Sequence, residues 1–347
     1  MHNQKTTATV KVLPNKTLFF TLTFLLASFQ VFAQLGYRVR VDSTIPVKSI
    51  RALSIISQDV AWAGGTEGKV GRMDSTGKWH WNSIPGYDTC DWRSLVAFND
   101  QRALVLNAGE PAHILLTENG GESWKEVYTN TTKGIFFDGM AFKNAAEGMA
   151  IGDPVDGKFT IIRTKDSGKT WQADPASTSP AAKEGEAIFA ASNTSLRILP
   201  DGQACFVTGG KHSRFIKGWD EWKAVNWDFT QGEPGKGAFS VAFADAVHGV
   251  AVGGDYTKDT VTTNNCLITK DGGKSWRKAV RPPAGYRSCV QHIQGDTYIA
   301  TGTSGTDISN DGGLTWSRMI HAKFHVLASY RTFIWLAGSR KIGMMRM

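Results

Sequence analysis

The feature that most constrains this chain is a short turn that recurs along it. Four segments share the pattern Thr/Ser-x-Asp/Asn-Gly/Ser-Gly-x-Ser/Thr-Trp, at residues 117–124, 164–171, 269–276 and 309–316. In a turn, Asp or Asn hydrogen-bonds the backbone two residues further on, and Gly accepts a positive φ. Because the hydroxyl residue and the Trp then begin a strand, each segment predicts a β-hairpin with an aromatic anchor. The acidic residues of these segments are therefore expected to serve the turn and not catalysis.

The spacing of these turns indicates a repeat of roughly 40–50 residues. A degenerate copy of the turn lies at residues 73–79. The gap between the second and third full copies is long enough for two units, and Trp222 lies at the end of the first of these. Two further strands are predicted upstream of each turn, as at 137–142 followed by 148–152. The repeats therefore predict an all-β fold, a single β-propeller of about seven four-stranded blades.

The two ends of the chain complete this ring. The last unit has strands near His325 to Gly338 and near 342–345, and then the chain ends without a fourth strand. Residues 37–41 alternate in a way that suits the missing strand. A ring closed by strands from both termini leaves no free sheet edge, so we expect one propeller domain over residues 34–347.

The first 33 residues are typical of a secretory signal peptide. Three lysines precede an apolar run at 18–27 that is too short to span a bilayer comfortably, and residues 31–33 read Val-Phe-Ala, a typical cleavage site. We expect a secreted or periplasmic protein with no membrane span after cleavage. An uncleaved membrane anchor is the alternative.

Charge and cysteine content narrow the function further. The formal net charge of +8 falls to +5 once residues 1–33 are removed, and no Lys/Arg-rich run follows, which argues against nucleic-acid binding.

No cysteine sits in a C-x-x-C pair. An oxidising compartment would allow three disulfide connectivities among four cysteines, but buried free thiols are the favoured interpretation for Cys90, Cys205, Cys266 and Cys289.

Propeller geometry gathers a set of polar residues on one face. Loops between the second and third strands of each blade, loops between blades, and the starts of the innermost strands all reach that face. The ligand site of a propeller usually lies there, at the mouth of the channel. The alternative is that these residues only form salt bridges and turns between blades. The candidates for ligand binding are Arg51, Arg93, Glu110, Asp138, Asp153, Asp156, Glu186, Asp255, Tyr256, Arg287 and His325.

Three enzyme classes make different demands on these residues. A glycosidase needs two carboxylates at a set separation, which the candidate acids could supply. A nicotinamide or flavin enzyme needs a Gly-x-Gly-x-x-Gly turn between strand and helix, and none is present. His321 and His325 flank a strand and make no metal face; Asp153 with Asp156 is the one conceivable calcium pair. We expect neither a cofactor nor a metal, and the catalytic status stays open.

The chain resembles the Asp-box β-propellers, and most closely the photosystem II stability/assembly factor family and its relatives outside photosynthesis. The four repeated turns carry the resemblance, with the inner strands ending in Ala-Phe and the Gly-x-Ala-x-Gly strands that follow them. Stretches at 108–112, 152–157, 184–187 and 253–256 are similar to an exported branch of that family. Members of that branch bear labels such as oxidoreductase or glycosyl hydrolase.

The resemblance implies a binding function. Photosynthetic members are assembly chaperones that grip a membrane-protein subunit through an Arg-lined face. By that likeness we expect an exported binding or assembly-factor-like propeller with a polar Arg/carboxylate funnel, whose partner is a glycan or an envelope protein. The alternative is a glycoside hydrolase or lyase acting on an anionic or complex glycan, since sialidases and xyloglucanases share the repeated turn.

Overall fold

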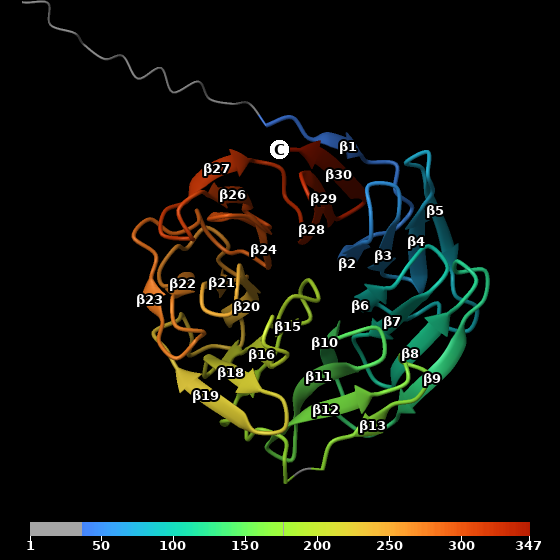
Figure 1. Ribbon diagram of the computed structural model, residues 1–347, viewed down its shortest axis with the longest axis horizontal. Helices are drawn as coiled ribbons and strands as arrows, with labels where there is room; N and C mark the ends of the chain where they lie inside the picture. The colour runs from blue at the N-terminus through green and yellow to red at the C-terminus, as the bar shows by residue number, and fades with distance from the viewer. Residues whose placement is uncertain (1–36, 176) are drawn as a thin grey trace, which may run out of the picture. The chain divides into compact units, whose positions relative to one another are not determined.

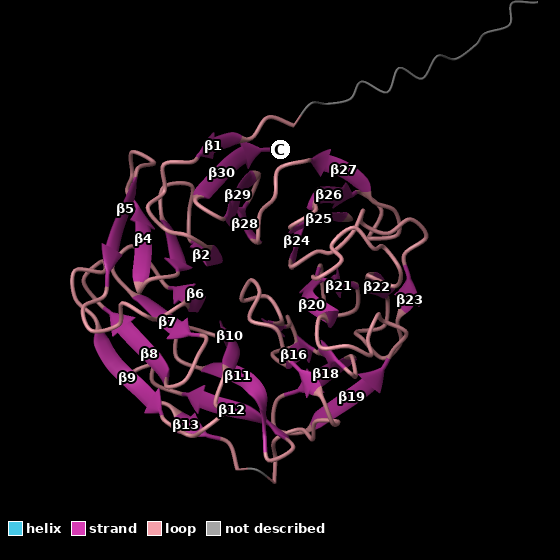
Figure 2. Ribbon diagram, turned by 180° about the vertical axis from the view of Figure 1, so that it is seen from behind, coloured by secondary structure: helices cyan, strands magenta, loops and turns pink. Residues whose placement is uncertain are grey.

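The chain folds into a ring of seven antiparallel sheets around a central channel, as the repeats predicted (Figure 1). The computed structural model describes residues 37–175 and 177–347, and the predicted signal peptide at 1–33 lies outside them. Figure 2 shows the same ring from behind, built of strands and loops. In the part of the chain that the structure describes, no helix has the length and apolarity needed to cross a membrane.

The first three blades follow one another along the chain. Blade 1 contains β2 (Ile50–Ile55), β3 (Ala61–Gly65), β4 (Lys69–Met73) and β5 (Trp79–Ser83). Blade 2 contains β6 (Trp92–Ala97), β7 (Ala103–Asn107), β8 (Ala112–Thr117) and β9 (Lys125–Asn130). Blade 3 contains β10 (Phe137–Phe142), β11 (Gly148–Val155), β12 (Lys158–Thr164) and β13 (Gln172–Ala173).

Blades 4 to 6 continue the pattern with one addition. Blade 4 contains β15 (Leu196–Ile198), β16 (Ala204–Val207), β18 (Arg214–Gly218) and β19 (Trp222–Asn226). Blade 5 contains β20 (Lys236–Phe243), β21 (Gly249–Asp255), β22 (Cys266–Thr269) and β23 (Arg277–Lys278). The short strands β14 (Glu186–Ala187) and β17 (Gly209–Gly210) extend its sheet. Blade 6 contains β24 (Cys289–Gln294), β25 (Thr297–Gly302), β26 (Gly305–Ser309) and β27 (Ser317–Ile320).

Blade 7 joins the two ends of the propeller. It contains β28 (Val326–Tyr330), β29 (Phe333–Gly338), β30 (Lys341–Arg346) and the N-terminal strand β1 (Arg40–Asp42). β1 pairs antiparallel with β30, with Arg40 opposite Met344, and this confirms closure by an N-terminal strand. The strand is displaced from the predicted 37–41 and begins at Arg40.

The topology gives the ring two different faces. The connections between second and third strands, and those between blades, lie on one side, which we call the loop face. The connections between first and second strands, and the repeated turns between third and fourth strands, lie on the other side, the turn face. The innermost strand of each blade runs along the channel between them.

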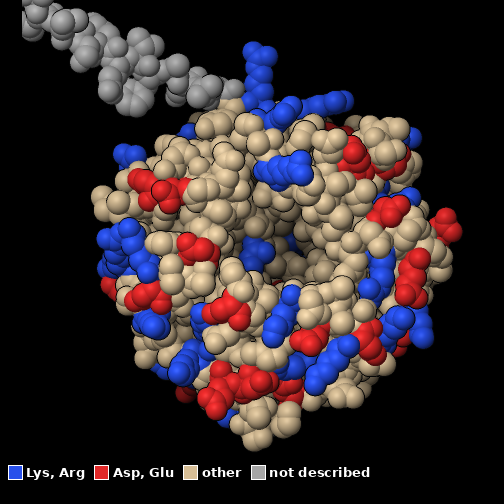
Figure 3. All heavy atoms as spheres, in the orientation of Figure 1, with Lys and Arg blue, Asp and Glu red and all other residues tan. Residues whose placement is uncertain are grey.

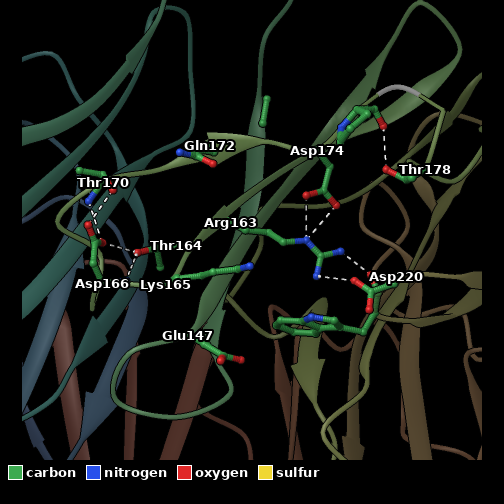
Figure 4. Close-up of a pocket in the computed structure, with 13 residues that line it drawn as sticks. Glu147, Arg163, Thr164, Lys165, Asp166, Thr170, Gln172, Asp174, Thr178 and Asp220 are labelled. Carbon is green, nitrogen blue, oxygen red and sulfur yellow. Dashed lines mark hydrogen bonds and ion pairs between the residues drawn. The ribbon is translucent and has the colours of Figure 1, made fainter.

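The repeated turns form the hydrogen bonds that their sequence predicted. In the turn of blade 3, Asp166 Oδ1 accepts from the Thr170 backbone N–H at 2.9 Å (Figure 4). Thr164 Oγ1 accepts from the Gly168 N–H at 2.8 Å. The pKa of the Asp166 carboxyl is lowered to about 2, mainly because the Thr170 hydroxyl donates a hydrogen bond to it. Asp271 and Asp311 make the same contacts in blades 5 and 6.

The glycine at the centre of each repeated turn rests on the preceding blade. Gly168 has a φ of +81°, and a Cβ placed on it would lie 2.4 Å from Leu104 in β7. Gly313, with a φ of +85°, stands in the same relation to Val250 in β21, at 2.6 Å. The turn therefore needs this glycine for two reasons: its backbone has a positive φ, and the neighbouring blade leaves no space for a Cβ.

The tryptophans that close the repeated turns are buried to different degrees. Trp171 and Trp316 are buried, with 8% and 3% of their surface exposed, whereas Trp124 and Trp276 are only half-buried. The Trp276 indole also donates to Gly273 O at 3.2 Å. Cys90, Cys205, Cys266 and Cys289 are buried and form no disulfide, which confirms the favoured interpretation.

Gly168→Ala tests the contact between blades against a matched glycine. Gly77 also has a positive φ, +82°, but nothing lies within 4 Å of a Cβ placed there. Gly77→Ala should lower the free energy of unfolding by about 1 kcal/mol through backbone strain alone. Gly168→Ala should cost a further ~1–3 kcal/mol because its methyl group overlaps Leu104. Urea denaturation of both variants measures the difference, and equal losses would contradict the contact.

Candidate functional site

A cavity of about 420 Å³ opens in the channel on the loop face. Figure 3 shows a hollow at the centre of the ring with Lys or Arg atoms inside it. Its wall is made by the starts of the innermost strands of several blades and by the segment 187–191, which connects blades 3 and 4. The lining residues include Arg51, Arg93, Phe136, Asp138, Asp153, Phe239, Tyr256, Tyr286, Ser288 and His325.

In four blades, the same position of the inner strand contributes a side chain to the cavity wall. The pairing register shifts between Ile50 and Ala52 in blade 1, and at the corresponding place in blades 2, 3 and 5. The residue skipped by each bulge is re-aimed out of the regular alternation, and each of these residues lines the cavity. The four skipped residues are Arg51, Arg93, Asp138 and Phe239.

The segment between blades 3 and 4 crosses the channel beside the cavity. It is visible in Figure 1 as the loop that leads toward the centre before β15. Asn193 Nδ2 donates to Leu95 O of blade 2 at 3.2 Å, and Asn193 Oδ1 accepts from the Met140 N–H of blade 3 at 2.9 Å. Ser192 Oγ donates to Ser288 O of blade 6 at 2.7 Å. Residues 189–194, which we call the crossing segment, are thus tied to blades on several sides of the channel.

The two acids of the cavity, Asp138 and Asp153, both have a raised pKa. Asp138 is fully buried and no hydrogen bond to either of its carboxylate oxygens is found in the described chain. Burial, and then the nearby charge of Asp153, raise its pKa well above the ordinary value. Asp153 accepts from the Ile188 N–H at 2.8 Å, and burial raises its pKa to about 6.

The basic groups differ in how well they are neutralised. Arg93 Nε donates to Asp91 at 2.7 Å. Arg51 forms no ion pair with any described residue; burial, followed by the Arg93 charge, lowers its pKa. Burial and then Arg51 also lower the pKa of His325 to about 4, so its imidazole is neutral near pH 7. Arg51 is therefore the cation of this cavity with an unmatched charge.

Aromatic rings cover one side of the cavity. Phe189 of the crossing segment stacks on Phe239 with ring centroids 3.9 Å apart and planes 3° apart. Tyr286 meets the edge of Phe239 at 4.8 Å. Tyr256 is 54% exposed at the rim. The cavity thus combines a cationic side with an apolar, aromatic side.

Six of the predicted residues line this one cavity, and five do not. The six are Arg51, Arg93, Asp138, Asp153, Tyr256 and His325. Among the five, Glu110 accepts the Gly134 N–H at 2.7 Å, Asp255 accepts the Thr257 N–H at 2.9 Å, and Asp156 occupies a turn with a φ of +50°. These three serve local turns and loops, the alternative that the sequence left open.

Glu186 does not face the cavity, and its assignment to the funnel is corrected. Its Oε2 lies 2.6 Å from Arg214 Nη2, and its Oε1 accepts from the Thr208 hydroxyl at 2.6 Å. Both partners belong to the region of blade 4. The chain turns at β14. The Glu186 side chain therefore points into the protein interior, whereas residues 187–191 line the cavity. Its carboxylate is buried and already saturated.

Arg287 is corrected for a different reason, a shift of one residue. A Cβ on Gly302 would lie 2.3 Å from Tyr286 O, as one on Gly152 would lie 2.1 Å from Phe136 O. Ser288 in blade 6 therefore corresponds to Asp138 in blade 3, and Arg287 corresponds to the buried core position Phe137. Arg287 is fully buried and bonds Asp307, whose other oxygen lies 3.0 Å from Arg318 Nε.

The sequence predicted Tyr256 but not the other aromatic residues of the cavity. Phe239 ends up beside the acids and arginines because a bulge re-aims it, and Phe189 belongs to a segment with no repeat signal. Tyr286 adjoins Arg287, so a comparison of the glycines that follow each inner strand could have found it. No cluster of three or more potential metal ligands occurs within residues 37–175 and 177–347.

The corrected role of Glu186 predicts a loss of stability. Glu186→Ala leaves the Arg214 guanidinium buried without its carboxylate, which should cost about 3–5 kcal/mol of unfolding free energy. Glu184→Ala is the matched control, because Glu184 pairs with Lys211 on the exposed surface. Thermal denaturation compares the two. A Glu186→Ala variant that melts like wild type would restore Glu186 as a candidate for ligand binding.

Comparisons with known proteins support the fold. No protein-family model and no curated protein matches the chain. Among solved structures, YCF48 bound to D1 peptide matches with a TM-score of 0.65 and 16% identity, covering 90% of this chain and 95% of that one. YCF48 from Cyanidioschyzon merolae matches with a TM-score of 0.64 and 14% identity, covering 89% and 98%. Virginiamycin B lyase from Staphylococcus aureus matches with a TM-score of 0.66 and 12% identity, covering 90% and 99%. The chain is thus a seven-bladed β-propeller that is structurally similar, at low sequence identity, to YCF48 and to virginiamycin B lyase.

Proposed function

We propose that this propeller is exported, as its N-terminal pattern predicts, and binds an anionic segment of a protein partner in the loop-face cavity. The observation that carries the proposal is Arg51. It lies within the cavity without an ion pair in the described chain, and burial makes its charge costly there. A ligand carboxylate would supply the missing countercharge, and a guanidinium offers the planar fork that carboxylates fit.

The rest of the lining favours a peptide over a free ion. Phe189 and Phe239 stack beside the charged residues and present an apolar wall. A peptide that carries a carboxylate next to an apolar side chain uses both halves of the cavity. Similarity to a YCF48 structure that holds D1 peptide supports this choice of ligand class.

The buried state of Asp138 argues against a two-carboxylate glycosidase. That mechanism needs two carboxyl groups in contact with the scissile bond or its attacking water. Asp138 has no exposed surface, so of the cavity acids only Asp153 could approach a sugar. A binding function needs no second accessible acid.

A lyase acting on an acidic glycan is the second candidate. It is favoured by His325, whose imidazole stays neutral above pH about 4 and can accept a proton. Arg51 beside it could hold the uronate carboxylate. The similarity to virginiamycin B lyase makes this chemistry worth testing, although that similarity is one of fold.

Arg51→Gln should weaken ligand binding without unfolding the protein. The mature chain from Gln34 is used to select from a peptide library with free acidic side chains and C-termini, and affinities are measured by fluorescence anisotropy. Loss of one charge-assisted pair predicts at least about a tenfold weaker Kd. Arg277→Gln, an exposed arginine of β23, is the control and should bind normally.

Three outcomes separate the candidates. Peptides that lose affinity when the carboxylate is amidated support the binding proposal. Wild-type protein that releases unsaturated products from uronate polymers, when His325→Gln does not, would favour the lyase candidate over the binding proposal. Equal affinity of wild type and Arg51→Gln for every selected peptide would overturn the assignment of this cavity.

Asp153 makes the same binding depend on pH. Because its pKa is raised to about 6, the carboxyl is mostly ionised at pH 8 and mostly protonated at pH 5. Protonation removes a negative charge from the cavity, so affinity for the selected acidic peptide should rise as the pH falls from 8 to 5. Asp153→Asn should bind at pH 8 as wild type does at pH 5, with a flat profile. An Asp153→Asn profile as steep as that of wild type would exclude this carboxyl as the cause.

A further inference from the structure

The channel has a second hollow at its other end, on the turn face. Its volume is about 750 Å³, and its wall is formed where the inner strands of blades 3, 5 and 6 end and where 199–202 connects the first two strands of blade 4. We call it the turn-face chamber. The residues that line it are Phe142, Lys143, Asn144, Arg197, Ile198, Leu199, Pro200, Asp201, Gly202, Ala242, Phe243, Gln291 and His292.

Arg197 brings a positive charge into this chamber without a carboxylate partner. Its Nε donates to Val241 O at 3.0 Å and its Nη2 to Val290 O at 3.4 Å. Both acceptors are backbone carbonyls of neighbouring inner strands. No acid within residues 37–175 and 177–347 pairs with Arg197, and burial lowers its pKa. The backbone contacts fix the direction of the guanidinium but leave its charge uncompensated.

Another arginine shows what a neutralised guanidinium looks like in this fold. Arg163 lies between blades 3 and 4, where its Nε donates to both oxygens of Asp174, at 2.8 and 2.9 Å (Figure 4). Its guanidinium also lies over the Trp219 ring at 4.6 Å. The charge of Arg163 is therefore matched by a carboxylate, whereas that of Arg197 is not matched by any described acid.

The remaining charged groups of the chamber add to the positive side. Lys143 is exposed, lies 5.0 Å from the Trp219 ring and forms no ion pair with a described residue. His292 Nε2 donates to Gly295 O at 2.7 Å. Asp201 is the single acid of the lining, and Lys217 already pairs with it at 2.9 Å. Arg197 and Lys143 thus leave the chamber with a net positive charge.

We propose that the turn-face chamber is a second binding site, for an oxyanion group such as a carboxylate or a phosphate. The anion lies between the Arg197 guanidinium and the Lys143 ammonium, where both charges act on it. The crossing segment separates this site from the loop-face cavity, because Ser192, Asn193 and Thr194 bond to inner strands across the channel. The proposal does not rest on the function proposed for that cavity.

Titration calorimetry of the mature protein with inorganic phosphate, and separately with acetate, tests the site. Wild type should bind at least one of the two, and the preferred anion identifies phosphate or carboxylate as the recognised group. Arg197→Gln should weaken that binding at least about tenfold. Lys143→Gln should weaken it about threefold or more, since an exposed charge contributes less. Arg277→Gln is the control with an equal change of net charge and should bind as wild type does.

Each outcome decides the assignment. Wild type that binds neither anion overturns the proposal, as does Arg197→Gln with wild-type affinity. Where Arg197→Gln fails to fold, Lys143→Gln decides: weaker binding than Arg277→Gln supports the site, and equal binding overturns it. A loss of binding in Arg51→Gln with none in Lys143→Gln places the anion in the loop-face cavity and also overturns it.

Discussion

The close contact between each repeated turn and the blade before it is the constraint on which the ring depends. The turn brings a glycine with positive φ against the side chains of the neighbouring sheet, and a methyl group at Gly168 or Gly313 would overlap Leu104 or Val250. The buried clusters likewise cross from blade to blade, as Leu104 of blade 2 packs with Ile162 of blade 3. Because each blade buries its face only on its neighbours, the sheets are stable as a closed set. The channel and its two hollows are a consequence of that closure.

Inner-strand bulges give this regular ring a cavity with a particular set of side chains. A perfectly alternating strand would direct every second residue to the same side. The skipped residue in blades 1, 2, 3 and 5 instead leaves the ladder at the mouth of the channel. The same structural position thus carries Arg51, Arg93, Asp138 and Phe239, so the chemistry of the cavity can vary while the packing around it stays constant.

Sequence alone could predict the fold almost completely, because the turn chemistry and the repeat spacing act locally and recur. It could predict which face holds the loop-face cavity, and it placed Arg51, Arg93 and Asp138 together. It could not place Arg287 or Glu186, for two physical reasons. Arg287 differs from a cavity position by one residue, which in a strand reverses the side. Glu186 finds Arg214 from a distant strand, and such a tertiary pair leaves no local pattern. The crossing segment has no repeat to reveal it, so the aromatic wall that includes Phe189 also stayed hidden.

Closure of blade 7 sets the order in which this protein can become complete during synthesis. β1 leaves the ribosome before every other strand of the ring, and its partner β30 leaves last. β1 must wait without a strand partner while the six other blades are made. Joining the two ends then closes a loop of nearly the whole domain, although the entropy of closure grows only slowly with loop length. The nascent chain therefore carries unpaired strands until β30 is made, and its need for protection from aggregation is greatest just before the ring is finished.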